Sequence, residues 1–163
     1  MMHIDDETKR QLQIEQCLTG KWHGLEYSLE GGFGCKETDL EVNNIITELF
    51  SKYEYLGCGR NRIVFKLKSG NYVLKFPVNN AGVSNNDWEG SVCGSTEPNN
   101  PDVTQYAKTR WIQFRGFICC VMEIVKPIND ETNLPEWIHH IDSCQVGLTR
   151  KNKLVAYDFG EYN

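Results

Sequence analysis

The hydrophobic period of this chain changes near Tyr53, and this change most constrains what it can fold into. Over residues 38–50 the apolar side chains recur every three or four positions, which predicts an amphipathic helix with one buried stripe. The stripe consists of Val42, Ile45, Ile46, Leu49 and Phe50. Over residues 62–68 the apolar side chains alternate instead, as they do in a half-buried strand. The chain therefore joins helical and strand segments in one α+β fold.

Turn residues divide the rest of the chain into short elements. Gly70 and its neighbours predict a tight turn, and Pro77 ends the strand that follows it. Arg115 and Gly116 predict a second turn between strands. In chain order we expect strands at 62–68, 72–76, 111–114 and 117–125, a short helix at 85–92, a helical segment at 136–141, and a C-terminal β-hairpin made of 145–149 and 153–158. The sheet is expected to be mostly antiparallel, with one inserted helix.

Two further helix predictions concern the N-terminal part of the chain. Residues 5–18 are polar with a few apolar positions, which is typical of a short amphipathic helix. Thr38 and Glu41 match a capping box, which places the start of the next helix at Thr38. We therefore divide the chain into a helical extension, residues 1–52, and a domain, residues 53–163. Within that domain a sheet (53–126) precedes a residual helix and the hairpin (127–163).

Composition limits the classes of partner. A length of 163 residues and an apolar content of 40% allow one domain with a real core. The formal net charge of −5 argues against non-specific binding to nucleic acid, which needs an excess of Lys and Arg. There is no apolar run of membrane-spanning length and no signal-peptide pattern at the start of the chain. We therefore expect a cytoplasmic protein with no membrane partner.

The seven cysteines form no recognisable disulfide or metal pattern. They include no C-x-x-C pair, and no His stands at zinc-finger spacing. Cys119 and Cys120 are adjacent in a predicted strand, so their side chains should point to opposite faces and would not easily bridge. We expect reduced thiols, and neither zinc nor haem as a cofactor.

Four short motifs carry residue types suited to chemistry, and the first is a glycine turn. Gly57 and Gly59 stand just before Arg62 and Val64. Glycines let backbone amides approach a phosphate, although two glycines also serve hairpin geometry alone. Arg62 could contact such a phosphate or obstruct it.

The second and third motifs lie in apolar strands. Lysine is rarely buried without a partner, so a buried Lys75 would need a counter-charge. The alternative is an edge strand in which Lys75 faces water. The third motif is an apolar strand that ends with Met122, Glu123 and Val125.

The fourth motif is Asp158-Phe159-Gly160, which follows Gln145 by thirteen residues. Carboxylate and amide oxygens are ligands suited to Mg²⁺. Just before Gln145 stand His139, His140 and Asp142. The two histidines could face solvent at the end of a helix, pack in the core, or provide a base.

In this order, over residues 55–160, the four motifs resemble the nucleotide site of the protein-kinase family. The resemblance implies a nucleotide-binding lobe and a metal-binding hairpin, with the large helical lobe nearly absent. It implies that the glycine turn covers the phosphates of ATP or ADP and that Lys75, paired with Glu89, binds them. The resemblance implies that adenine meets backbone groups near Glu123 to Val125, with Met122 in the gatekeeper position, and that Gln145 and Asp158 hold Mg²⁺. The implied nucleotide-binding residues are Gly57, Gly59, Arg62, Val64, Lys75, Glu89, Met122, Glu123 and Val125. The ending is similar to that of small kinase-like proteins of bacteriophages, which implies a viral protein in a host cytoplasm.

The chain departs from the family at the catalytic step. His140 stands where the family has its catalytic aspartate, and Asp142 is the nearest acid. Without that acid and a substrate lobe, a hydroxyl cannot be positioned against a γ-phosphate. We therefore expect a truncated pseudokinase-like binding module for a protein partner, with nucleotide as an additional ligand at most.

Two alternatives stay open. One is an active ATP-dependent phosphotransferase in which His140, Asp142 or a partner supplies the base. The other is an unrelated α+β interaction protein. In the truncated binding module, the apolar face that the large lobe would cover has to be covered by the N-terminal helices, by self-association into a homo-oligomer, or by a host protein.

Overall fold

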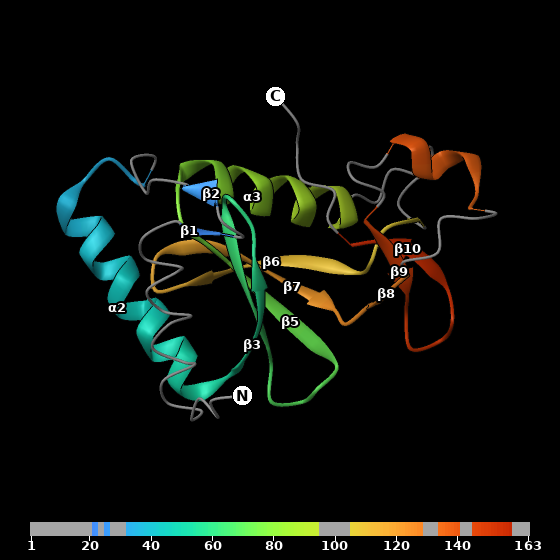
Figure 1. The fold of residues 1–163 in the computed structure, drawn as a ribbon, viewed down its shortest axis with the longest axis horizontal. Helices are drawn as coiled ribbons and strands as arrows, with labels where there is room; N and C mark the ends of the chain where they lie inside the picture. The colour runs from blue at the N-terminus through green and yellow to red at the C-terminus, as the bar shows by residue number, and fades with distance from the viewer. Residues whose placement is uncertain are drawn as a thin grey trace.

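The computed structural model of this chain describes residues 21–22, 25–26, 32–94, 105–128, 134–140 and 145–157 (Figure 1). The helix predicted at 5–18 lies outside the described residues. Asp142 and the Asp158-Phe159-Gly160 motif also lie outside them. Near the start of the described chain, two very short strands, β1 (Lys21–Trp22) and β2 (Leu25–Glu26), pair antiparallel. The sequence analysis did not predict these strands.

The centre of the described chain is a five-stranded antiparallel sheet in the order β3-β4-β5-β7-β6. Its strands are β3 (Glu54–Cys58), β4 (Arg62–Lys66), β5 (Tyr72–Pro77), β6 (Thr109–Phe114) and β7 (Phe117–Glu123). The α+β class and the antiparallel sheet are therefore confirmed. The turn at Arg115 and Gly116 joins β6 to β7 with both residues at positive φ.

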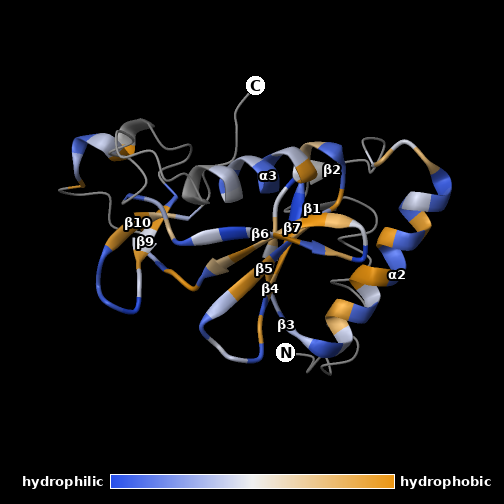
Figure 2. Ribbon diagram, turned by 180° about the vertical axis from the view of Figure 1, so that it is seen from behind, coloured by the Kyte–Doolittle hydropathy of each residue, from blue (hydrophilic) through white to orange (hydrophobic). Residues whose placement is uncertain are grey.

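Helix α2 (Lys36–Lys52) packs its apolar stripe on one face of this sheet. All five residues of the predicted stripe are buried there, against Ile63, Phe65, Leu74, Phe76 and Cys119. Figure 2 shows the strands and the inner side of α2 as the main hydrophobic regions. Although the sequence assigns α2 to the extension, it shares one core with the sheet.

The predicted capping box at the start of this helix is wrong. The helix begins two residues earlier, with Cys35 as its N-cap and no side-chain cap hydrogen bond. Asp39 instead reaches back from the first turn, where its Oδ1 accepts a hydrogen bond of 2.9 Å from the amide of Phe33. Gly32 allows this approach, because a Cβ there would lie 2.6 Å from Asp39 Oδ1.

Helix α3 (Asn80–Gly94) follows β5 and is longer than the predicted segment at 85–92. Asn79 precedes it, and its Oδ1 accepts a 2.8 Å hydrogen bond from the amide of Gly82. Asparagine in this position is a strong N-cap, so the helix can begin well before its first apolar residues. Figure 1 shows α3 lying across the sheet, away from α2.

The C-terminal hairpin is present, and a third strand joins it. Strands β9 (Val146–Leu148) and β10 (Leu154–Ala156) pair as predicted, and β8 (Lys126–Pro127) adds to β9. The segment predicted as helical at 136–141 is a 3₁₀ helix, η3 (Glu136–His140). In Figure 1 this small sheet lies at the opposite end of the molecule from α2.

Neither α2 nor α3, the two α-helices in the described part of the chain, is long and apolar enough to cross a membrane.

Candidate functional site

The alternation of side chains along the central strands separates an apolar face of the sheet from a charged one. Leu74 and Phe76 of β5 point into the core beneath α2. Val73 and Lys75 therefore point to the other face, toward α3 and the hairpin. Because β5 lies between β4 and β7, Lys75 is on a central strand and is buried. The alternative of an edge-strand lysine that faces water is wrong.

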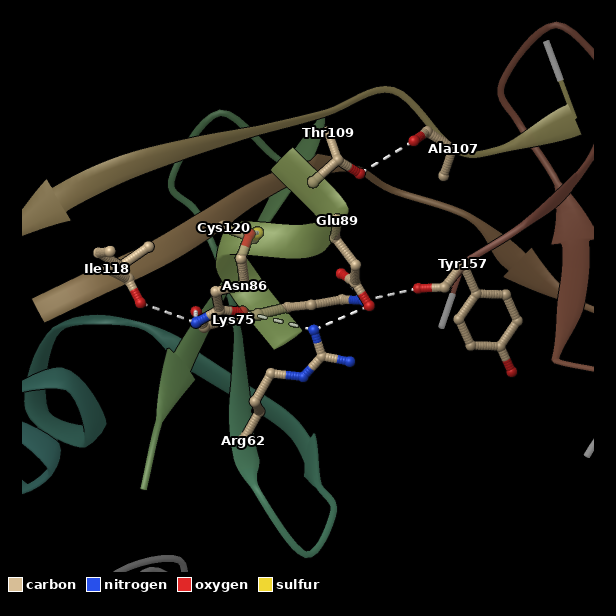
Figure 3. A network of polar contacts seen from close by, with 9 residues as sticks. All are labelled: Arg62, Lys75, Asn86, Glu89, Ala107, Thr109, Ile118, Cys120 and Tyr157. Atoms are coloured by element: carbon tan, nitrogen blue, oxygen red, sulfur yellow. Dashed lines mark hydrogen bonds and ion pairs between the residues drawn. The ribbon is translucent and has the colours of Figure 1, made fainter. Parts of the chain in front are cut away.

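A buried cluster of three charged side chains occupies this second face (Figure 3). Glu89 of α3 accepts from Lys75 Nζ at 2.9 Å through Oε2 and from Arg62 Nη1 at 2.8 Å through Oε1. The exposed fractions are 0% for Glu89, 4% for Lys75 and 7% for Arg62. The lysine and glutamate that the sequence paired do form an ion pair. Arg62, from the strand after the glycine turn, uses the second carboxylate oxygen.

Asn86, one turn before Glu89 on α3, completes the cluster. Its Nδ2 donates to the carbonyl of Lys75 at 3.2 Å and to that of Ile118 at 2.9 Å. Its Oδ1 lies 3.4 Å from Arg62 Nη1. The sequence analysis did not identify this residue. An asparagine three positions before a glutamate on one side of a helix is the signal that could have found it, because such positions are neighbours.

Lys75 also ties the sheet to the hairpin. Its Nζ donates a 2.6 Å hydrogen bond to the carbonyl of Tyr157, the last described residue. Nearby, the amide of Ala107 donates to the carbonyl of Ala156 at 2.8 Å, and Thr109 Oγ1 donates to the carbonyl of Ala107 (Figure 3). The lysine therefore holds three parts of the fold together: β5, α3 and the hairpin.

Three of the residues assigned to the nucleotide lie together in a packed cluster. Val64, Met122 and Val125 pack with Val73 and Val155. The amide of Glu123 donates to the carbonyl of Lys108, and the amide of Ile124 donates to that of Asn71, both at 2.9 Å. An adenine at this place would have to separate the apolar side chains and would meet two amides that are already bonded.

The glycine turn is open toward its surroundings. A Cβ at Gly57 or Gly59 would meet no atom within 4 Å, and neither residue has a positive φ. The amide of Gly59 closes the turn by donating to the carbonyl of Arg62 at 2.8 Å. Neither steric crowding nor backbone conformation in the described chain therefore requires glycine at these two positions.

The residues assigned to magnesium and to base catalysis are described only in part. Gln145 is half-buried, and its backbone carbonyl accepts from the amide of Tyr157 at 3.1 Å. Asp158 and Asp142 are outside the described residues, and His140 ends η3 without a described side chain. Among the described residues, no three His, Cys, Asp or Glu side chains gather in a group that could hold a metal ion.

Cys119 and Cys120 point to opposite faces, as predicted. Cys119 lies in the core beneath α2, while Cys120 Sγ donates to the carbonyl of Asn86 at 3.0 Å. Burial, with a smaller contribution from Cys120, raises the pKa of the Cys119 thiol to about 12. This thiol therefore stays protonated and unreactive at neutral pH.

Comparison with known proteins finds no match to this chain among family models, curated proteins or solved structures. The functional argument therefore depends on the geometry of the site.

Proposed function

We propose that this protein is a binding module built on a reduced kinase-like lobe, and that it engages a protein partner without transferring phosphoryl groups. The observation that carries the proposal is the buried cluster around Glu89. Its lysine stands on the third strand of the five-stranded sheet and its glutamate on the helix that follows. Protein kinases place their Lys–Glu ion pair in the same way.

The same cluster argues against catalysis. Lys75 and Arg62 both bind Glu89, and both are more than nine-tenths buried. Because both cations are so deeply buried, a triphosphate could contact either one only if the groups that cover it moved aside. The described residues therefore fit a nucleotide poorly.

Individual exposed apolar side chains are the candidate contacts of the proposed module with a partner. The described chain has large, half-exposed apolar residues on its strands and on α3, namely Leu56, Tyr72, Trp88 and Trp111. Aromatic side chains of this kind are common anchors at protein interfaces. A kinase-like protein of a bacteriophage would meet such a partner in the host cytoplasm.

Capture with matched variants tests the proposal. The tagged full chain is incubated with host lysate, and the captured protein is quantified for wild type and for the single variants Leu56→Ser, Trp88→Ser and Trp111→Ser. We expect at least one variant to lose capture while its melting temperature is unchanged. The proposed function is contradicted if all three variants capture as much protein as the wild type. It is also contradicted if labelled phosphate is transferred from Mg-ATP to any captured protein.

A second candidate is a module that also binds Mg-ATP, and the open glycine turn favours it. Since folding does not require glycine at Gly59, an approaching phosphate is one reason to have it there. Calorimetry with Mg-ATP on wild type and Gly59→Ala decides between the two. Saturable binding that Gly59→Ala abolishes, at an unchanged melting temperature, would establish the second candidate; no heat of binding in wild type would exclude it.

A further inference from the structure

Over residues 80–91, where the structure describes its side chains, the side of α3 that faces the sheet is almost without apolar side chains. The buried positions in this stretch are Gly82, Asn86, Glu89 and Gly90. In Figure 2 the described part of α3 is mostly pale or blue. The hydrophobic effect scales with the apolar area removed from water, so it contributes little to this contact from the helix side.

The two glycines explain how closely the helix approaches. A Cβ at Gly90 would lie 2.7 Å from the backbone nitrogen of Trp111, and one at Gly82 would collide with the carbonyl of Asn61. This approach brings the Glu89 carboxylate and the Asn86 amide into contact with the sheet. Polar contacts with the sheet therefore replace the usual apolar stripe.

The carboxylate of Glu89 is fully buried, and each of its two oxygens is paired with a cation. A carboxylate that is fully out of water is stable only when its charge is paired and its oxygens accept hydrogen bonds. Lys75 serves Oε2 from β5, and Arg62 serves Oε1 from β4. Arg62 also lies beside Asn86, so it contacts both polar residues that dock the helix.

We propose that Arg62 is a built-in counter-cation that completes the docking of α3 without any bound ligand. With both carboxylate oxygens already served, α3 has one constitutive position, and neither nucleotide nor free phosphate is required to hold it. The consequence for function, that the binding surface is presented permanently, rests on the proposed function. The docking of α3 by Arg62 does not depend on that function.

Hydrogen–deuterium exchange of the full chain tests this inference. Exchange is followed in peptides from α3 and, as an internal reference, from α2. The variants are Arg62→Met, which removes the charge, Arg62→Lys, which keeps it, and the control Arg110→Met, an exposed arginine on β6. We expect Arg62→Met to raise α3 exchange by at least about tenfold with α2 unchanged. Arg62→Lys should recover part of the protection, and Arg110→Met should match wild type.

A nucleotide arm completes the experiment. Addition of Mg-ATP, or of inorganic phosphate alone, should leave α3 exchange in the wild type unchanged. The inference is overturned if either anion slows α3 exchange in the wild type, or if α3 stays as protected in Arg62→Met as in wild type. If Arg62→Met does not fold, Arg62→Gln is read by the same criteria. Partner capture by the same variants separates the docking inference from the proposed binding function. If the variants still capture the partner and α3 exchange does not respond to the Arg62 substitutions, only the docking inference is refuted.

Discussion

Glu89 is the residue on which the buried polar contacts of this protein converge. It is fully buried, and it is held by one cation from each of two neighbouring strands. Glu89→Gln removes the carboxylate charge that both buried cations, Lys75 and Arg62, contact. We expect a loss of about 3–5 kcal/mol in the free energy of unfolding, measured by urea denaturation. Asp87→Asn, an exposed neighbour on the same helix, should stay within about 0.5 kcal/mol of wild type.

Gly82 shows how a second kind of residue holds the same helix. An alanine in place of a helical glycine normally stabilises by about 1 kcal/mol. At Gly82 the added Cβ would collide with the backbone carbonyl of Asn61, which cannot rotate away. We therefore expect Gly82→Ala to lower the melting temperature, whereas Ser84→Ala on the exposed side of α3 should leave it unchanged or raise it. A higher melting temperature for Gly82→Ala would contradict the close approach of α3.

At the scale of elements, α2 and α3 are held to the sheet by different forces. α2 buries an apolar stripe, and Leu49 in that stripe is 1% exposed. Leu49→Ala should cost about 2–5 kcal/mol of unfolding free energy, because it removes buried methyl groups and leaves a cavity. Leu40→Ala on the same helix, where the side chain is 62% exposed, is the matched control and should cost little. Equal effects in chemical denaturation would mean that α2 does not pack as described.

The outer side of α2 makes a pH-dependent contact with the turn between β6 and β7. A hydrogen bond from Lys52, and then the charge of Arg115, lower the pKa of Glu48 from its ordinary value of 4.5. Arg115 Nη2 lies 2.5 Å from Glu48 Oε2. A lowered folded-state pKa gives stability that is present above pH 4.5 and is lost as the pH falls through the lower, folded-state pKa.

We therefore expect the difference in unfolding free energy between wild type and Glu48→Gln to shrink as the pH falls below about 4.5, and also as salt is raised at neutral pH. Both titrations use urea denaturation at fixed temperature. A difference that grows on acidification would show that the carboxylate is not stabilised in the folded state.

The contrast between apolar and polar packing also explains which elements could be predicted from the sequence. The stripe of α2 and the alternation over residues 62–68 are apolar patterns, and the helix and the strand β4 that they predict are both present. The start of α3 was missed because its sheet-facing positions are glycine, asparagine and glutamate, which produce no hydrophobic period. Strand β8 has only two residues and no pattern of its own. This strand is defined only by its antiparallel pairing with the edge of β9.

The candidate site divides in a similar way. A lysine within an apolar strand demands a counter-charge, so the pair of Lys75 and Glu89 could be predicted. The role of Arg62 could not, since its sequence position is equally compatible with contacting or obstructing a ligand. Only the fold shows that its guanidinium is directed at Glu89.

At the scale of the whole molecule, the sheet has two differently built faces. α2 closes one face with apolar packing, while α3 and the hairpin close the other around a charged centre. Lys75 contacts both α3 and the hairpin, through Glu89 and the carbonyl of Tyr157. We infer that this lysine stabilises the assembly of the fold.

The most direct test of this account is the thermal unfolding of the wild-type protein at increasing Mg-ATP. A ligand that binds only the folded state stabilises it by RT ln(1 + [L]/Kd), or about 2.7 kcal/mol at one hundred times Kd. Because Lys75 and Arg62 are both paired with Glu89 and are both more than nine-tenths buried, we predict that the melting temperature is the same at zero and at millimolar Mg-ATP. A saturable rise in melting temperature with Mg-ATP would contradict the account, since it would show that a nucleotide reaches the site that the structure closes with Arg62.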